Sequence, residues 1–366
     1  MSTPTLTRMP ADAADVLVNQ GLARKHSAQT TATAKAGAAA KAGAAGSRGT
    51  SVTMALPDLR MSFTGQCHPD LDWADTHAND WVAEYGLVPE HRHDTFALPK
   101  IGHLAAAGYP TASRAVLALA ADWGAWLYAF DDVHADEGSP DVLGLTAQIA
   151  AMLAALDGAA GTTPLARALD DISTRFAALS TPSQHIRFIA NVKGYLLGVL
   201  AECTYRTHGA IPATEDYLPL RLQASGCLTC LSIVELATGA AEFEPAHHIG
   251  ITALTNMGAY VVALANDVYS CLREIDKADV DFIFNLPLVL AHHHAVGLEA
   301  AITRSAAMVQ ECIDRFTAGY HRFAPSLTPA AARHLEGIAQ WTQGTFDWMA
   351  ACGRYSGYWA AAGPEA

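Results

Sequence analysis

The chain has 366 residues, of which 51% are hydrophobic and only 8% are aromatic. This length is enough for one large core or two smaller domains. The charge is uneven, because residues 1–50 contain six Lys+Arg and two Asp+Glu, whereas the rest of the chain contains 17 and 34. Such an acidic body argues against a nucleic-acid partner, since phosphate backbones require a basic surface. It is compatible with an anionic substrate that is held through divalent cations, which bind carboxylates.

The N-terminal part of the chain differs from the rest in composition. Residues 27–52 are rich in Ala, Gly, Thr, Ser and Lys and contain no large apolar side chain. Because nothing in such a segment offsets the entropy lost on ordering, we expect a disordered or flexible extension over 1–52 and a folded body over 53–366. No apolar run approaches the ~20 residues of a membrane helix. The seven scattered cysteines are typical of buried thiols in a cytoplasmic protein, so we expect a cytoplasmic protein without a membrane span.

From residue 113 onward, Ala-rich apolar stretches alternate with Gly, Pro, Ser and Thr. Strand-like alternation is hard to find, and no period of 20–50 residues repeats. The sequence therefore predicts an all-α, single-domain bundle of about ten helices, a few of them surrounded by the others. The apolar stretches lie at 113–130, 142–157, 163–178, 185–206, 227–240, 247–273, 281–295, 297–319 and 328–351.

A first polar cluster lies directly after the apolar run that ends at Phe130. Four acidic side chains there fall within seven residues, at what the pattern predicts to be the C-terminal end of a helix, where the helix dipole favours cations instead. The cluster is tolerated if it is fully solvated or if divalent cations neutralise it. The residues alone leave both interpretations open. The four acids are Asp131, Asp132, Asp136 and Glu137.

A second polar cluster interrupts the predicted helix over 247–273. At 100° per residue, Asn266, Ser270 and Glu274 share one helix face and span roughly 12 Å. Their amide, hydroxyl and carboxylate oxygens are the hard ligands that magnesium or manganese accepts. The alternative is an ordinary polar helix end with a surface ion pair between Arg273 and Asp267.

Three motifs together carry a resemblance to a known family. Residues 266–274 read N-D-V-Y-S-C-L-R-E and resemble the second metal motif of class I terpene synthases, N-D-x-x-S-x-x-(K/R)-E. The upstream acidic cluster resembles the family's aspartate-rich motif in its D-D-x-x-x-D form, and Arg354-Tyr355 is similar to the Arg-Tyr pair that ends bacterial members. Order and spacing agree over about residues 55–360. The resemblance implies the all-α class I terpenoid synthase fold, with a catalytic domain over 53–366.

The resemblance also implies an activity. A terpene cyclase of this type is a carbon–oxygen lyase acting on phosphates, which ionises an isoprenyl diphosphate, cyclises the cation and releases diphosphate. Three Mg²⁺ ions are implied, for which Mn²⁺ can substitute, and farnesyl diphosphate is the favoured substrate. Chain-elongating prenyltransferases carry two aspartate-rich motifs, so the Asn-Ser-Glu pattern favours a cyclase. The alternatives are a cyclase of geranylgeranyl or (methylated) geranyl diphosphate, and a non-enzymatic helical binding protein; either a monomer or a homodimer is compatible with the sequence.

Both metal motifs receive catalytic roles from the resemblance. Asp131 of the first motif would hold two of the metal ions, and Asp136 is the further ligand that the D-D-x-x-x-D form offers. Asn266, Ser270 and Glu274 of the second motif would hold the third ion.

Catalytic donors to the leaving diphosphate are implied as well. Arg273, Arg354 and Tyr355 match the family's donors, and the planar guanidinium of Arg meets phosphate oxygens bidentately. Bacterial members carry a further arginine that senses the diphosphate. Leu222 occupies that position here, and we expect the neighbouring Arg221 to take the role.

The remaining matched residues would shape an apolar pocket around the cation. Aromatic faces stabilise a cation without acting as nucleophiles. Leu127 and Tyr128 precede the first motif by one helical turn, and Trp341 and Trp348 share one face of the last long helix. Gly226 fits the helix break of the family, where a backbone carbonyl can point into the cavity.

Overall fold

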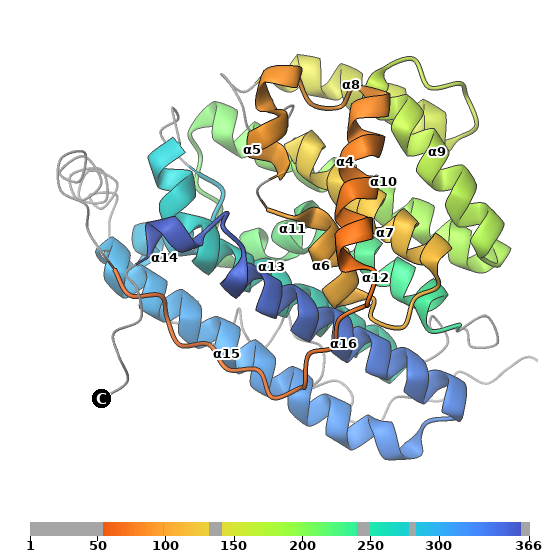
Figure 1. The fold of residues 1–366 in the computed structure, drawn as a ribbon. Helices are drawn as coiled ribbons and strands as arrows, with labels where there is room; N and C mark the ends of the chain where they lie inside the picture. The colour runs from red at the N-terminus through yellow and green to blue at the C-terminus, as the bar shows by residue number, and fades with distance from the viewer. Residues whose placement is uncertain (1–53, 98, 132–140, 240–248, 278–282, 360–366) are drawn as a thin grey trace, which may run out of the picture.

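The computed structural model describes residues 54–97, 99–131, 141–239, 249–277 and 283–359. Within these ranges the protein folds into thirteen α-helices and three short 3₁₀ turns, without a strand, so the predicted all-α class is confirmed (Figure 1). The α-helices are α4 (Leu71–Tyr85), α5 (His93–Ala97), α6 (Ile101–Gly108), α7 (Arg114–Ala129), α8 (Val142–Leu156), α9 (Pro164–Leu179), α10 (Pro182–His208), α11 (Thr214–Ala224), α12 (Cys227–Ala237), α13 (Ile249–Lys277), α14 (Leu286–His294), α15 (Leu298–Phe323) and α16 (Pro329–Ala351).

All nine predicted stretches have a helical counterpart, from α7 to α10 and from α12 to α16. The sequence pattern missed α4, α5, α6 and α11. The omission of α11 has a clear reason, because this helix contains Pro219 and opens with Glu215 and Asp216. A proline inside a helix removes a backbone donor and is read as a breaker, yet packing against the long helix α10 keeps α11 helical.

Several helices begin at a hydroxyl residue followed by proline or by a good helix former. The side chains of Thr163, Thr181 and Thr328 each accept a hydrogen bond from the backbone N–H three residues later, and a proline follows each of them. Ser113 caps α7 in the same way without a proline. Such caps satisfy N–H groups that have no partner within the helix, and proline at the first position loses no hydrogen bond. At these four helices, the Ser, Thr and Pro residues between the apolar stretches therefore serve as N-caps or as first helical residues.

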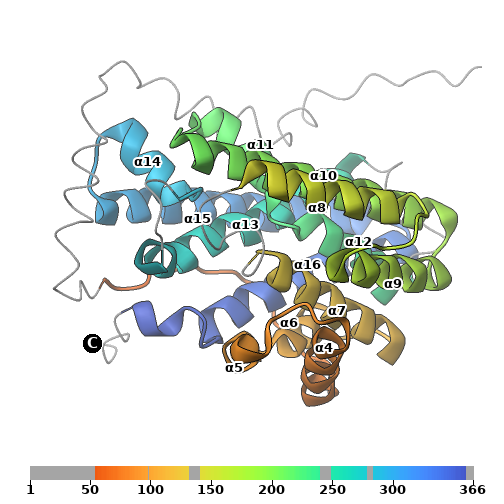
Figure 2. The ribbon, with the colours of Figure 1, turned by 90° about the horizontal axis from the view of Figure 1, so that it is seen from above.

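The centre of the bundle is α13, which carries the second polar cluster. It packs against α11, α12, α14, α15 and α16, and in Figure 2 it lies between α14 and α16. By length and composition its segment Ile249–Asp276 could cross a membrane, but 67% of its most apolar stretch is buried inside the protein. The apolar character of α13 is therefore explained by its neighbours in the core.

A close backbone contact sets the position of α16 relative to α6. A Cβ atom at Gly344 would lie 2.1 Å from the backbone oxygen of Ala107, so a larger residue would push α6 away from α16. The glycine thus lets α6 and α16 pack backbone to backbone.

Candidate active site

A cavity of about 650 Å³ opens between α7, α10, α11, α12, α13 and α16. It gathers side chains that are up to 267 positions apart in the sequence, from Val88 to Tyr355. Gly226 is not among the residues that line it, although its neighbours Ser225 and Cys227 are, and Asp136 lies outside the described residues. The predicted site residues that line the cavity are Leu127, Tyr128, Asp131, Arg221, Asn266, Ser270, Arg273, Glu274, Trp341, Trp348, Arg354 and Tyr355.

The α13 wall presents the three oxygen ligands of the second motif. Asn266, Ser270 and Glu274 all line the cavity, as their spacing predicts. Ser270 is 2% exposed, and its Oγ has no hydrogen-bond partner among the described residues. Burying a hydroxyl without a partner costs free energy. A hard cation bound at this wall would give the oxygen its missing partner, so the residues fit a divalent metal.

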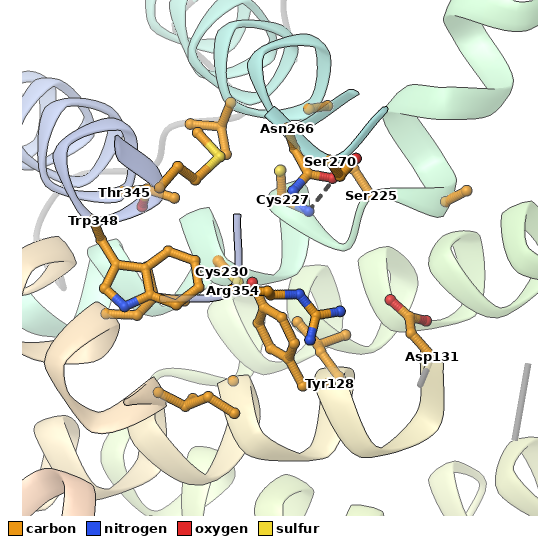
Figure 3. A pocket seen from close by; sticks show the side chains of 18 of the residues that line it. Tyr128, Asp131, Ser225, Cys227, Cys230, Asn266, Ser270, Thr345, Trp348 and Arg354 are labelled. Atoms are coloured by element: carbon orange, nitrogen blue, oxygen red, sulfur yellow. Dashed lines mark hydrogen bonds between the residues drawn. The ribbon is translucent and has the colours of Figure 1, made fainter. Parts of the chain in front are cut away.

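The opposite wall carries the first residue of the acidic motif. Asp131 directly follows α7 and its cap residue Phe130, and its Oδ1 accepts a hydrogen bond of 2.5 Å from the Tyr195 hydroxyl of α10. Figure 3 shows Asp131 on one side of the pocket and Asn266 and Ser270 on the other. A cation in this pocket would therefore meet oxygen ligands from both sides.

The amide of Asn266 is oriented at both of its ends. Its Oδ1 accepts from Arg221 at 2.9 Å, and its Nδ2 donates to the Tyr355 hydroxyl at 2.9 Å. The side chain therefore connects α11 with the C-terminal Arg-Tyr pair. Because an amide that is held at two points cannot rotate freely, the carbonyl oxygen of Asn266 keeps one direction in the cavity wall.

Asp267 is buried directly beside this amide. It is 1% exposed, and it accepts from Arg221 Nε at 2.7 Å, from the Tyr217 hydroxyl and from the backbone N–H of Leu286 at 3.3 Å. The alternative of a surface pair between Arg273 and Asp267 is therefore wrong, because the carboxylate faces inward to α11. Burial acts to lower the pKa of Arg221, but Asp267 together with Tyr217, Glu202 and Glu274 outweighs burial and raises this pKa, which keeps the guanidinium charged.

Aromatic rings form the wall beside the C-terminal arginine. The Arg354 guanidinium carbon lies 4.9 Å from the centre of the Tyr128 ring and 5.9 Å from that of Tyr355. Trp348 meets both rings edge to face, at centroid distances of 6.0 and 6.5 Å. Its indole N–H donates to the Pro99 carbonyl at 3.0 Å, which fixes the ring. This wall suits a cation, because each ring presents an electron-rich face.

Two thiols line the cavity near the start of α12. Cys227 and Cys230 are both free cysteines. Burial raises the pKa of Cys227 to about 11 and that of Cys230 to about 12. Both side chains are consequently neutral near pH 7 and offer the cavity no thiolate nucleophile.

Comparison with known proteins decides the family. Residues 122–315, more than half of the chain, match the profile of terpene synthase family 2, C-terminal metal binding. The chain belongs to the class I terpene synthase family. A (+)-T-muurolol synthase ((2E,6E)-farnesyl diphosphate cyclizing) of Roseiflexus castenholzii is 30% identical over 80% of this chain and 92% of its own. A 4-epi-cubebol synthase ((2E,6E)-farnesyl diphosphate cyclizing) of Streptosporangium roseum is 26% identical over 84% and 94%.

Solved structures agree with this assignment. The SVS_A2 protein from ancestral sequence reconstruction is 25% identical and superposes with a TM-score of 0.73, covering 84% of this chain and 92% of that one. A cucumene synthase variant is 26% identical with a TM-score of 0.69, covering 81% and 99%. The resemblance inferred from the three motifs is confirmed, and the protein is a metal-dependent terpene cyclase of the bacterial type that acts on an isoprenyl diphosphate.

The terpene synthase has the predicted helix break at Gly226. This glycine has φ +68°, and the axes of α11 and α12 meet there at 44°. A Cβ atom at this position would lie 3.1 Å from the Leu127 side chain, which would have to shift, and the positive φ itself favours glycine. The Gly226 carbonyl accepts from the backbone N–H groups of Thr229 and Cys230 at 3.0 and 3.3 Å. Gly226 therefore immediately precedes α12, and its carbonyl oxygen has its hydrogen-bond partners within that helix.

The structure separates the two neighbours on α11 that the sequence left in question. Leu222 is 8% exposed, belongs to the hydrophobic core and is not among the described residues that line the cavity. Arg221 does line the cavity, but two of its nitrogens are bound to Asp267 and Asn266. The contacts thus show Arg221 as a support for Asn266, and its contact with diphosphate stays a prediction.

Sequence reasoning missed several residues of this cavity. Glu202 and Arg206 of α10 both line it, and Arg92 joins them from the segment after α4. The spacing of Glu202 and Arg206 within a predicted helix was the available signal, because residues four apart share one helix face. Asn285, which contacts Glu274, gave a weaker signal as an Asn placed before a helix that has proline at its second position.

Proposed function

We propose that this terpene synthase is a carbon–oxygen lyase acting on phosphates, which uses three Mg²⁺ ions to cyclise farnesyl diphosphate to a sesquiterpene hydrocarbon or alcohol. The observation that carries the proposal is the single cavity in which oxygen ligands on two walls, arginines and an aromatic wall meet. Two relatives whose names specify (2E,6E)-farnesyl diphosphate as the substrate support the chain length.

The metal ligands in this proposal come from both walls. Asp131, with Asp136 of the same motif, holds metal on the α7 side, and Asn266, Ser270 and Glu274 hold it on the α13 side. The buried, unpartnered Oγ of Ser270 supports a ligand role. Bound Mg²⁺ supplies Lewis acidity, which stabilises the negative charge of the leaving diphosphate.

The cationic and hydroxyl side chains of the cavity bind and orient the diphosphate. Arg354 and Tyr355 reach it from the C-terminal segment, and Arg273 and Arg221 from α13 and α11. Burial raises the pKa of Tyr355, so its hydroxyl keeps its proton and can donate it in a hydrogen bond. These donors hold the leaving group at one end of the cavity and leave the other end to the hydrocarbon chain.

The remaining wall controls the fate of the carbocation. Tyr128 and Trp348 present aromatic faces, while Leu127 and Trp341 add apolar surface. The neutral thiols of Cys227 and Cys230 add no strong nucleophile. A chamber of this composition folds the isoprenyl chain and keeps bulk water away from the cation until a proton is lost or one water molecule adds.

One experiment tests both the activity and the substrate. The purified protein is incubated with Mg²⁺ and separately with geranyl, methylated geranyl, farnesyl and geranylgeranyl diphosphate, and the extracts are analysed by gas chromatography and mass spectrometry. We expect a cyclic fifteen-carbon product from farnesyl diphosphate and no product after metal chelation. Cyclic products from another chain length alone would replace the substrate assignment. A folded protein without any product would favour the helical binding protein.

The ligand role of α13 is tested with a matched pair of variants. Asn266→Ala removes a proposed metal ligand and should reduce product formation from farnesyl diphosphate at least about 100-fold, since even the loss of a group that only supports a ligand costs about 10–100-fold. Asn256→Ala changes a partly buried asparagine of the same helix that is outside the cavity wall. Circular dichroism should show unchanged helical content in both. Full activity of Asn266→Ala would exclude the assigned site.

A further inference from the structure

Asn285 lies at the junction between the second metal motif and α14. It is 1% exposed and immediately precedes α14. Its Nδ2 donates to Glu274 Oε2 at 3.0 Å and to the backbone oxygen of Asp267 at 3.0 Å. One amide group therefore bridges two positions of α13 that are seven residues, or about two turns, apart.

The side chain of Asn285 does not serve its own helix. Asparagine is favoured before a helix because its oxygen accepts from the N–H groups of the first turn. Here the side chain makes no such capping bond, and Oδ1 is buried without a hydrogen-bond partner in the described part of the chain. An amide that leaves its oxygen unpaired carries a cost in stability. Because its oxygen makes no such bond, we attribute the role of the Asn285 side chain to its NH₂ group, which donates to α13.

The contact with Glu274 has a direct consequence for the cavity. Glu274 lines the cavity, and one of its carboxylate oxygens accepts the Asn285 hydrogen bond. A neutral donor restricts the rotation of the carboxylate without adding a positive charge that would compete with a cation. The backbone N–H of Leu286 binds Asp267 Oδ2 at 3.3 Å, so the start of α14 is tied to α13 beside both residues. This bond fixes the backbone next to Asn285 and thereby the position of its side-chain amide.

We propose that Asn285 is a positioning residue that orients the Glu274 carboxylate and thereby sets the affinity of the α13 wall for divalent cations. The inference rests on the proposed metal role of Glu274 and goes beyond it by assigning the side chain that prepares this ligand. Asn285 itself contacts no metal or substrate; it acts through Glu274.

The test measures metal binding apart from turnover. Mn²⁺ is titrated into the full-length protein with inorganic diphosphate present, and bound Mn²⁺ is followed by electron paramagnetic resonance. Asn285→Leu, which keeps the branched shape of the side chain and removes the donor, should weaken Mn²⁺ binding about 10–100-fold. The Mg²⁺ concentration for half-maximal cyclisation should rise by a similar factor, while kcat returns toward the wild-type value at saturating Mg²⁺. Unchanged Mn²⁺ affinity in this variant would overturn the inference.

Two further variants separate positioning from folding. Asn191 also bridges helices, since its Nδ2 donates to the Leu228 carbonyl at 3.2 Å and to Ser232 Oγ at 2.9 Å, but it is outside the cavity wall. Asn191→Leu should lower Tm and leave Mn²⁺ affinity unchanged; a matching affinity loss in this variant would reduce the Asn285 effect to general destabilisation. Asn285→Ala removes the same donor without adding a charge beside Glu274 and serves if Asn285→Leu does not fold. It too should weaken Mn²⁺ binding, and wild-type affinity in it would contradict the inference.

Glu274→Ala distinguishes this inference from the proposed function. If Glu274→Ala leaves Mn²⁺ affinity unchanged, the proposed ligand role of Glu274 fails, and the inference fails with it. If Glu274→Ala weakens binding but Asn285→Leu does not, only the role of Asn285 is excluded. We expect both single variants to weaken binding. Asn285→Leu should then have no further effect in the Glu274→Ala background, because residues that act through one another are not additive.

Discussion

Two buried aspartates each form an ion pair with an arginine, in different parts of the molecule. Asp122 of α7 is 0% exposed and pairs with Arg175 at 2.8 Å, while Asp267 of α13 is 1% exposed and pairs with Arg221 at 2.7 Å. Each joins three helices: α4, α7 and α9 in the first case, and α11, α13 and α14 in the second. Only the second aspartate lies next to residues that line the cavity.

The difference is where each arginine leads. Arg221 continues from Asp267 to the amide oxygen of Asn266, a proposed metal ligand. Arg175 also forms an ion pair with Asp171 at 2.7 Å, and Asp171 accepts a hydrogen bond from the indole N–H of Trp81 at 3.2 Å. A buried ion pair gives little net stability, because desolvation offsets the attraction. The role of each pair therefore lies in the groups that it orients. The Asp267 pair orients a proposed metal ligand, and the Asp122 pair joins helices of the scaffold.

Removing the charge of Asp267 should have the largest effect. Asp267→Asn removes the carboxylate that pairs with Arg221, and the Arg221 side chain is only 13% exposed. We expect the free energy of unfolding to fall by about 3–5 kcal/mol. Because the support of Asn266 is disturbed as well, kcat/KM should fall at least about tenfold at temperatures where the variant is still folded. Urea denaturation followed by circular dichroism and a product assay measure the two losses separately. Wild-type turnover in the folded variant would show that the network does not orient Asn266.

The corresponding change at Asp122 should affect stability alone. Asp122→Asn leaves Arg175 with its second partner, Asp171, and the Arg175 side chain is 31% exposed. In addition, Asp122 Oδ1 has no hydrogen-bond partner among the residues that the structure describes, so the native carboxylate is itself incompletely satisfied. A loss of about 1–3 kcal/mol is expected from urea denaturation. The Mg²⁺ dependence of turnover should match the wild type, and a shift in it would erase the distinction between the two regions.

The periodic features of both regions could be predicted from the sequence. Asn266, Ser270 and Glu274 recur every four residues on a long apolar helix, so their common face follows from helix geometry alone. Hydroxyl residues before proline, such as Thr181, mark helix starts because they cap them. The bounds of α7 and α16 follow from the same two kinds of signal.

Features that depend on contacts between helices could not be predicted. Asp267 belongs to the second motif, but its inward direction depends on Arg221, which lies 46 positions earlier. Asn285 reaches Glu274 because α14 packs against α13. The helix α11 forms despite Pro219, since its contacts with α10 outweigh the local preference. Such outcomes are set by tertiary packing, which a single sequence does not reveal.

The smallest expected effect is a pH dependence that only the Asp122 region should show. The hydrogen bond from His77 Nε2 to Asp122, at 3.0 Å, raises the pKa of His77, while burial and Arg175 oppose the shift. A folded-state pKa above the unfolded value of about 6.5 means that protonated His77 stabilises the fold. This contribution is complete below about pH 6.5 and is lost as the pH rises through the folded-state pKa.

His77→Gln should therefore lower Tm more at about pH 5.5 than at about pH 8, and the difference from wild type should shrink with rising pH. The effect is small because the His77 side chain is 31% exposed and water screens the pair. Thermal unfolding of both proteins across this pH range measures it, with product formation assayed in parallel. In an Asp122→Asn background the same substitution should lose its pH dependence, because the acceptor that raises the pKa carries no charge. A pH dependence that persists there would place the titrating group elsewhere and leave the two aspartates less different than their contacts indicate.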